Sequence, residues 1–158
     1  IEVQATGSVL TDSAIAELGD FDSASIVLKM QSGKQVVISN SRRASYGYDQ
    51  RIEVHGSAGM IAAENQRPVL IELATADGYL RPPLHDFFMT RYSDAYVNEL
   101  KHFIHHLTEG ATLRPNGQDG LNALIVADAA YQSAISGQAV KPNITANKSD
   151  QELEASSV

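Results

Sequence analysis

The chain has 158 residues, of which 43% are hydrophobic and 20% are charged. This is long enough for one domain with its own core, and the composition is that of an ordinary globular protein. There are 12 lysines and arginines against 19 aspartates and glutamates, which gives a formal net charge of -7. We expect no binding to nucleic acid, because its phosphates require a basic surface. The sequence contains no cysteine, which excludes disulfides and thiolate chemistry.

The two ends of the sequence suggest how the chain is organised. Residues 1–5 have no initiator methionine and already follow a strand-like pattern. We therefore expect the chain to be a piece of a longer protein. No apolar run approaches the roughly 20 residues that a membrane helix needs, so no membrane partner is predicted. The lack of cysteine suits a cytoplasmic location.

The first half of the chain is typical of β-structure. Residues 2–10 alternate loosely between apolar and polar side chains and predict a strand. Two β-branched runs, 23–31 and 34–40, are joined by Ser-Gly and predict a hairpin. A second hairpin is expected over residues 50–64, with glycines where the chain reverses, and a further strand over residues 68–75.

The hydrophobic periodicity changes near residue 92. Within residues 92–107 the apolar side chains recur at spacings of three and four, which predicts one face of an amphipathic helix. Thr90 or Ser93 could cap its start, and Gly110 is a natural stop. Residues 117–136 predict a second helix, rich in small residues, that ends at Gly137. Shorter elements are expected as a helical turn at 14–18 and a strand within 139–144.

Consecutive hairpins followed by helices predict an α+β domain. We expect an open, mostly antiparallel sheet with two helices packed on one face. The strands carry apolar residues at successive positions, so both faces of the sheet should need cover. The uncovered face is then an expected interface of a homo-oligomer, a dimer or a tetramer. The domain should span residues 1–146, with a flexible tail over 147–158.

The most unusual stretch is the polar, aromatic connection at residues 41–51, SRRASYGYDQR. Loops between strands often carry functional groups. Tyr46 and Tyr48 alternate, so in an extended backbone both would point to the same side. Gly47 between them would let another backbone or a ligand approach closely. The alternative interpretation is a well-anchored surface loop whose arginines form salt bridges.

Other candidates for chemistry are weaker. His102 and His106 lie one helical turn apart beside His105 and could face a metal, but ordinary helix histidines are the preferred interpretation. His85 and Asp86 are adjacent, and adjacent side chains rarely face one another. The sequence also has no glycine-rich dinucleotide fingerprint, zinc-protease motif or nucleophile elbow. We therefore expect no catalytic, metal-binding or cofactor-binding residue in this chain.

The string Tyr-Gly-Tyr-Asp-Gln-Arg and its flanks, residues 40–60, resemble the second domain of the inositol dehydrogenase branch of the glucose–fructose oxidoreductase family. Residues 4–10, 91–96 and 119–124 agree with this resemblance. It implies an NAD-dependent enzyme that oxidises myo-inositol to the 2-keto-inositol. NAD and the catalytic lysine, aspartate and histidine would belong to an N-terminal part that precedes this chain.

The resemblance also implies what this chain would contribute. It would form the substrate wall and the subunit interface, and it would be inactive alone. Tyr48 would contact the polyol, and Tyr46 and Tyr92 are weaker candidates for the same role. Two alternatives remain open: a stand-alone β-sheet module for oligomerisation or ligand binding, and a family member that acts on another sugar or cyclitol.

Overall fold

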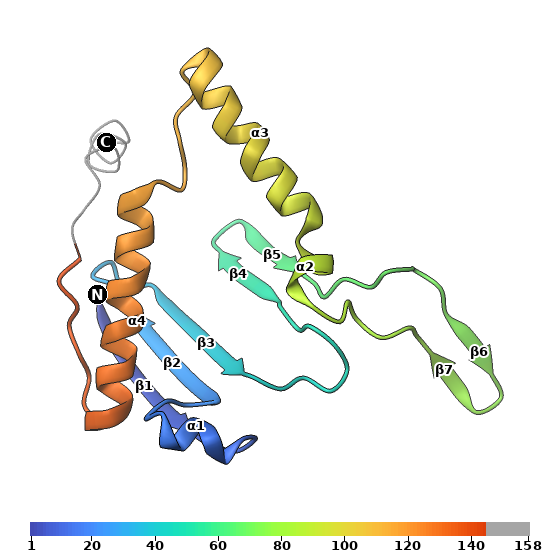
Figure 1. The fold of residues 1–158 in the computed structure, drawn as a ribbon, viewed down its shortest axis with the longest axis horizontal. Helices are drawn as coiled ribbons and strands as arrows, with labels where there is room; N and C mark the ends of the chain where they lie inside the picture. Colours follow the sequence, from blue (N-terminus) through green and yellow to red (C-terminus); the bar gives the residue numbers. More distant parts are fainter. Residues whose placement is uncertain (145–158) are drawn as a thin grey trace. The chain divides into compact units, whose positions relative to one another are not determined.

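The computed structural model describes residues 1–144, and these form an α+β chain with open antiparallel sheets (Figure 1). The chain divides into two compact units. The first consists of Ile1–Arg43 and the chain from Leu113 onward, and the second is Ala44–Thr112. The predicted fold class is confirmed. The strands of the described residues are distributed over three small sheets, however, instead of forming one continuous sheet.

The first unit is built on a three-stranded antiparallel sheet of β1 (Glu2–Ser8), β2 (Ser23–Lys29) and β3 (Gln35–Ser41). The β2–β3 hairpin predicted from Ser32-Gly33 is confirmed, and Gly33 has the positive φ of 83° that this turn requires. Cross-strand rows such as Val3, Leu28 and Val36 point to one face of this sheet.

Helix α4 (Gly117–Ser136) packs against β1 and covers that face. Its predicted bounds are confirmed: Asn116 and Asp119 form a capping box at the start, and Gly137 ends the helix in the left-handed conformation. The core between sheet and helix is made of Val3, Ala5, Leu28, Ala129 and Ala130. Full burial of a side chain such as Val3 stabilises the fold by about 1.5–3 kcal/mol.

The opposite face of the β1–β3 sheet is mostly polar. The outward rows pair Gln4 with Val27 and Val37, and the remaining outward positions carry polar or charged side chains: Glu2, Thr6, Ser8, Ser23, Ser25, Lys29, Gln35, Ser39 and Ser41. The expectation of a continuous apolar surface on both faces is therefore wrong for this sheet. Successive apolar residues such as those at 26–28 alternate between faces, and only a short outward row is apolar in this part of the chain.

The connection between β1 and β2 contains α1 (Ser13–Glu17), which confirms the helical turn predicted there. The connection is fixed by Asp22, whose side chain is almost fully buried. Its carboxylate accepts hydrogen bonds from the backbone N–H groups of Leu10, Thr11 and Asp12, at 2.7 to 3.1 Å. Burial by itself raises the pKa of Asp22, but these hydrogen bonds outweigh it and hold the pKa well below its usual value.

The second unit contains two short hairpins, β4 (Ile52–Gly56) with β5 (Gly59–Ala63) and β6 (Leu73–Thr75) with β7 (Gly78–Leu80). The first hairpin was predicted. The strand expected over residues 68–75 is reduced to its last three residues.

Helices α2 (Phe88–Arg91) and α3 (Ser93–Glu109) follow in the same unit. Gly110 ends α3 as predicted, with a φ of 70°. The predicted caps are wrong, because the N-cap position is Tyr92 and makes no side-chain hydrogen bond. The Thr90 hydroxyl instead donates to Asp86 and to the carbonyl of Phe87. The apolar stripe of α3 is exposed within the described chain.

The end of the described chain returns to β1. The strand expected within residues 139–144 is reduced to one bridge, in which Val140 exchanges backbone hydrogen bonds with Val3 at 2.8 and 2.9 Å. The predicted tail over 147–158 lies outside the described residues, as do the last two residues of the predicted domain. No helix among residues 1–144 is long and apolar enough to cross a membrane.

Candidate functional site

The Tyr46–Arg51 loop of the second unit is held by backbone hydrogen bonds to a distant segment. The Tyr48 N–H donates to the carbonyl of His85 at 2.7 Å, and the Leu84 N–H donates to the carbonyl of Tyr46 at 3.2 Å. Gly47 lies between them with a φ of 119°. A Cβ at Gly47 would lie 2.7 Å from the Leu84 Cβ. The close approach expected at Gly47 is therefore made by another stretch of backbone.

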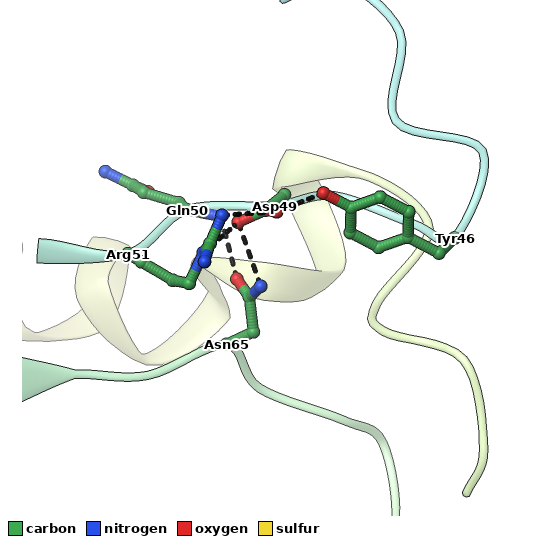
Figure 2. Close-up of polar contacts among 5 residues, drawn as sticks. All are labelled: Tyr46, Asp49, Gln50, Arg51 and Asn65. Carbon is green, nitrogen blue, oxygen red and sulfur yellow. Dashed lines mark hydrogen bonds and ion pairs between the residues drawn. The ribbon is translucent and has the colours of Figure 1, made fainter. Parts of the chain in front are cut away.

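The Asp49 carboxylate is the common hydrogen-bond acceptor of a cluster of polar side chains (Figure 2). Its carboxylate accepts a hydrogen bond from the Tyr46 hydroxyl, one at 2.9 Å from the Asn65 side-chain amide, and two from Arg51, at 2.9 Å from Nε and 3.2 Å from Nη2. Asn65 in turn accepts from the backbone N–H of Gln50 at 2.9 Å. The loop is thus tied to the segment that follows β5.

These contacts set the protonation states in the cluster. The hydrogen bond from Tyr46, followed by those from Asn65 and Arg51, lowers the pKa of Asp49 to about 2. The same bond to Asp49 raises the pKa of Tyr46 above its usual value. Asp49 is therefore ionised and Tyr46 is neutral at any ordinary pH. The Tyr46 hydroxyl must then be the hydrogen-bond donor, and the Asp49 carboxylate the acceptor.

Tyr48 has a different environment from Tyr46. Its ring packs edge to face on Tyr92, with centroids 5.8 Å apart and an interplanar angle of 87°. Burial, with a smaller contribution from Tyr48, raises the pKa of Tyr92. The Arg91 guanidinium lies 5.2 Å from the centroid of the Tyr92 ring, and its buried Nε has no hydrogen-bond partner in the described part of the chain.

The structure therefore brings Tyr48 and Tyr92, two of the three tyrosines predicted to contact the polyol, into contact with each other. Tyr46 lies in a turn, so the extended backbone that would direct its side chain to the same side as Tyr48 is absent there. Tyr46 is 55% exposed, and its hydroxyl is hydrogen-bonded to Asp49. All three tyrosines belong to the same unit.

The arginines of the 41–51 stretch are partly paired, as the surface-loop interpretation predicts. Arg51 forms an ion pair with Asp49 at 2.9 Å, while Arg42 lies 3.9 Å from Asp20 in the first unit. The backbone N–H of Arg43 donates to the Ser41 hydroxyl at 3.2 Å. Arg51 is thus the arginine of this stretch that shapes the tyrosine loop.

Two histidines of α3 contact backbone carbonyls, and the third contacts a carboxylate. His106 Nδ1 is bonded to the carbonyl of Ala111, and His102 Nε2 lies 3.2 Å from the carbonyl of Thr112. His105 lies 3.1 Å from Glu109. Residues 1–144 contain no group of three or more metal-ligating side chains placed to hold an ion. His85 contributes its backbone to the tyrosine loop.

Asn65 is the site residue that the sequence analysis missed. A signal for it was present in the predicted hairpin. Ile52 pairs with Ala63 in the observed register, and extending that register by two residues places Gln50 opposite Asn65. A polar side chain at that position can replace a ladder hydrogen bond where the strands separate.

Comparison with known proteins gives the family. Residues 1–141 match the family model for the C-terminal alpha/beta domain of an oxidoreductase family. The chain is 64% identical over 133 residues to an inositol 2-dehydrogenase of Rhizobium meliloti (strain 1021), a match that covers 84% of this chain and 40% of that protein. It is 46% identical over 140 residues to a myo-inositol 2-dehydrogenase of Thermotoga maritima, covering 89% of this chain and 42% of that protein.

A solved structure agrees with these relatives. The crystal structure of a myo-inositol dehydrogenase from Corynebacterium glutamicum superposes with a TM-score of 0.85 at 39% identity, and covers 92% of this chain and 44% of that one. The chain thus spans about two fifths of the length of the curated relatives described above. The family match over residues 1–141 and the 64% identical relative together show that the chain belongs to this oxidoreductase family, as its C-terminal alpha/beta domain.

Proposed function

We propose that this chain is the substrate-side domain of an NAD-dependent inositol 2-dehydrogenase that oxidises myo-inositol to the 2-keto-inositol. The observation that carries the proposal is the packed pair of Tyr48 and Tyr92 beside the Asp49 cluster. A tyrosine ring can pack on the C–H face of a polyol while its hydroxyl bonds to a ring hydroxyl. The names of the 64% and 46% identical relatives support the same substrate.

The proposed role of this chain is to bind and orient the polyol. Oxidation of a secondary alcohol removes a proton from oxygen and a hydride from carbon, and NAD would accept the hydride. A dinucleotide pyrophosphate is usually held by a glycine-rich turn between a strand and a helix. This chain has no such sequence, so NAD does not fit its residues and is proposed to bind another part of the protein.

We also propose that the protein is a homo-oligomer, a dimer or tetramer, that acts in the cytoplasm, where NAD is available. Apolar side chains on the β4–β5 hairpin support the assembly, and Ile61 is 75% exposed in the described chain. Val27 and Val37 add a smaller apolar row on the outward face of the β1–β3 sheet. Such surfaces are commonly covered by another copy of the protein.

The test compares this 158-residue chain with the full-length protein that contains it. Each is mixed with NAD and myo-inositol, and the formation of reduced cofactor is followed. We expect turnover by the full-length protein and none by the 158-residue chain. Turnover by the isolated chain, or a full-length protein that oxidises no cyclitol, would contradict the proposal. A substrate panel of inositol epimers and hexoses separates myo-inositol from another sugar of the same class.

A further inference from the structure

The direction of the hydrogen bond between Tyr46 and Asp49 has a consequence for ligand binding. The Asp49 side chain is only 15% exposed, and its carboxylate is ionised because Tyr46, Asn65 and Arg51 all donate to it. An ionised carboxylate can only accept hydrogen bonds. The Tyr46 hydroxyl must therefore point its proton at Asp49; Figure 2 shows the contact between the two groups.

The Tyr46 hydroxyl can then take part in a further hydrogen bond only as the acceptor. A phenol oxygen that has committed its proton keeps lone pairs that can accept a further hydrogen bond. Tyr46 is 55% exposed and its hydrogen bond to Asp49 is itself exposed, so this oxygen can be reached from outside the cluster. We propose that Asp49 is a positioning residue that holds the Tyr46 hydroxyl proton in a hydrogen bond to its carboxylate. Tyr46 can then bind a polyol hydroxyl only as a hydrogen-bond acceptor.

The substrate class in this inference rests on the proposed function, whereas the direction of the Tyr46–Asp49 hydrogen bond does not. An obligate acceptor selects for a group that can donate. A ring hydroxyl satisfies it, while a fluorine or a methyl ether at the same ring position does not. A site that bonds a hydroxyl discriminates against an analogue that lacks one.

The neighbouring charges do not reverse this polarity. Arg51 neutralises Asp49 through two hydrogen bonds, and Arg51 is itself stabilised in its charged form by Asp49 and more weakly by Glu64. Asn65 donates to Asp49 through its side-chain amide and accepts from Gln50 through its carbonyl, which fixes the orientation of the amide. Each of these partners in the described chain thus donates to the carboxylate.

The first experiment tests the polarity without any substrate. In the full-length protein carrying tyrosine labelled with ¹³C at Cζ, the Tyr46 signal is assigned with Tyr46→Phe and titrated by NMR at alkaline pH. We expect Tyr46 to ionise above the usual tyrosine pKa, and Asp49→Asn to return it toward that value. Asp77→Asn, a carboxylate loss on the exposed β6–β7 turn, is the matched control. A Tyr46 titration unchanged by Asp49→Asn overturns the proposal.

The second experiment measures kcat/KM for myo-inositol and for its monodeoxyfluoro analogues in the same variants. In the unmodified protein we expect one ring position at which fluorine costs about three- to tenfold, the range of one hydrogen bond. That penalty should vanish in Tyr46→Phe and shrink in Asp49→Asn, while Asp77→Asn keeps it. An equal penalty in Asp49→Asn contradicts the positioning role.

The two experiments separate the two proposals. A full-length protein that oxidises no polyol disproves the proposed function, and the NMR titration still decides whether Asp49 commits the Tyr46 proton. A protein that oxidises inositol but shows no Asp49-dependent fluorine penalty keeps the proposed function and disproves the specificity role.

Discussion

At the scale of single residues, Tyr46 and Tyr48 lie in one loop but make different contacts. Tyr46 is bound to a carboxylate, and Tyr48 is packed on another aromatic ring. The difference arises from contacts with residues that are distant in sequence, including Asn65 and Tyr92. The proposed contacts with a polyol therefore differ: Tyr48 offers its ring and hydroxyl, whereas Tyr46, held by Asp49, can only accept a hydrogen bond.

Tyr48→Phe in the full-length protein tests this assignment. We expect kcat/KM for inositol to fall by the equivalent of about 1–2 kcal/mol, because one hydrogen bond to the polyol is lost while the ring contact with Tyr92 remains. Steady-state kinetics give the result. Tyr79→Phe, on the exposed β6–β7 hairpin, is the control and should leave kcat/KM unchanged. An unaltered kcat/KM in Tyr48→Phe would make Tyr48 a purely structural residue.

Asp22 and Asp49 predict how stability depends on pH. Both carboxyls have a folded pKa below the unfolded value of about 3.9. Their contribution is therefore fully present above pH about 4 and is lost as pH falls toward the folded pKa, which is about 2 for Asp49. We expect Asp22→Asn to lower the free energy of unfolding at neutral pH and to flatten its decline in acid. Urea unfolding at several pH values measures this.

The control for this prediction is Asp77→Asn, whose carboxylate lies on an exposed turn. It should leave both the free energy of unfolding and its pH dependence unchanged. If Asp22→Asn declined in acid as steeply as the unmodified protein, the Asp22 hydrogen bonds would not be the source of the pH dependence.

At the scale of elements, the hairpins and helices are fixed largely by local signals. Glycines end α3 and α4, a capping box begins α4, and Ser32-Gly33 turns the β2–β3 hairpin. The start of α3 is an exception, because Thr90 lies within α2 and the N-cap position is Tyr92, which makes no side-chain hydrogen bond.

Gly47→Ala tests the remote contact that fixes the tyrosine loop. The backbone there has a φ of 119°, and the new Cβ would collide with Leu84 and with the His85 carbonyl. We expect the free energy of unfolding to fall by about 1–3 kcal/mol, the usual cost of such strain. Gly33→Ala is the control, because its φ is also positive, at 83°, but nothing lies within 4 Å of the added atom. Equal losses in the two variants would show that the collision has no effect.

Ser133→Ala tests the attachment of α4 to the sheet. The fully buried Ser133 hydroxyl accepts a hydrogen bond from the Ala5 N–H at 2.9 Å. Its removal leaves a buried N–H unsatisfied, so we expect a loss of about 1–3 kcal/mol in the free energy of unfolding. Ser136→Ala, which removes an exposed hydroxyl bonded within the same helix, should cost less. Denaturant unfolding compares the two variants, and equal losses would contradict the proposed attachment.

At the scale of the whole molecule, the chain has the family's C-terminal alpha/beta domain, and its assembly is proposed from exposed apolar side chains. We expect the full-length protein to sediment as a dimer or tetramer. Val37→Lys adds a charge to the outward row of the β1–β3 sheet, where Val37 is 74% exposed, and should weaken assembly if that face is the interface. Ile61→Lys makes the same test on β5.

Sedimentation velocity of the two variants distinguishes the surfaces. Gln4→Lys lies in the same outward row as Val37 and gives the effect of charge where no apolar side chain is removed. A monomeric full-length protein would disprove the proposed assembly. Assembly that survives both Val37→Lys and Ile61→Lys would place the interface elsewhere.

The sequence by itself determined the α+β class, the two hairpins, the bounds of α4 and the family, because these depend on local periodicity, turn residues and a distinctive string. It also directed attention to the Tyr46–Arg51 loop. Only the tertiary structure decided which tyrosines meet, that Asp49 and Asn65 hold the loop, and that the outward face of the β1–β3 sheet is mostly polar. These outcomes depend on contacts between residues far apart in the chain and on which side each strand buries, and local sequence patterns do not encode either.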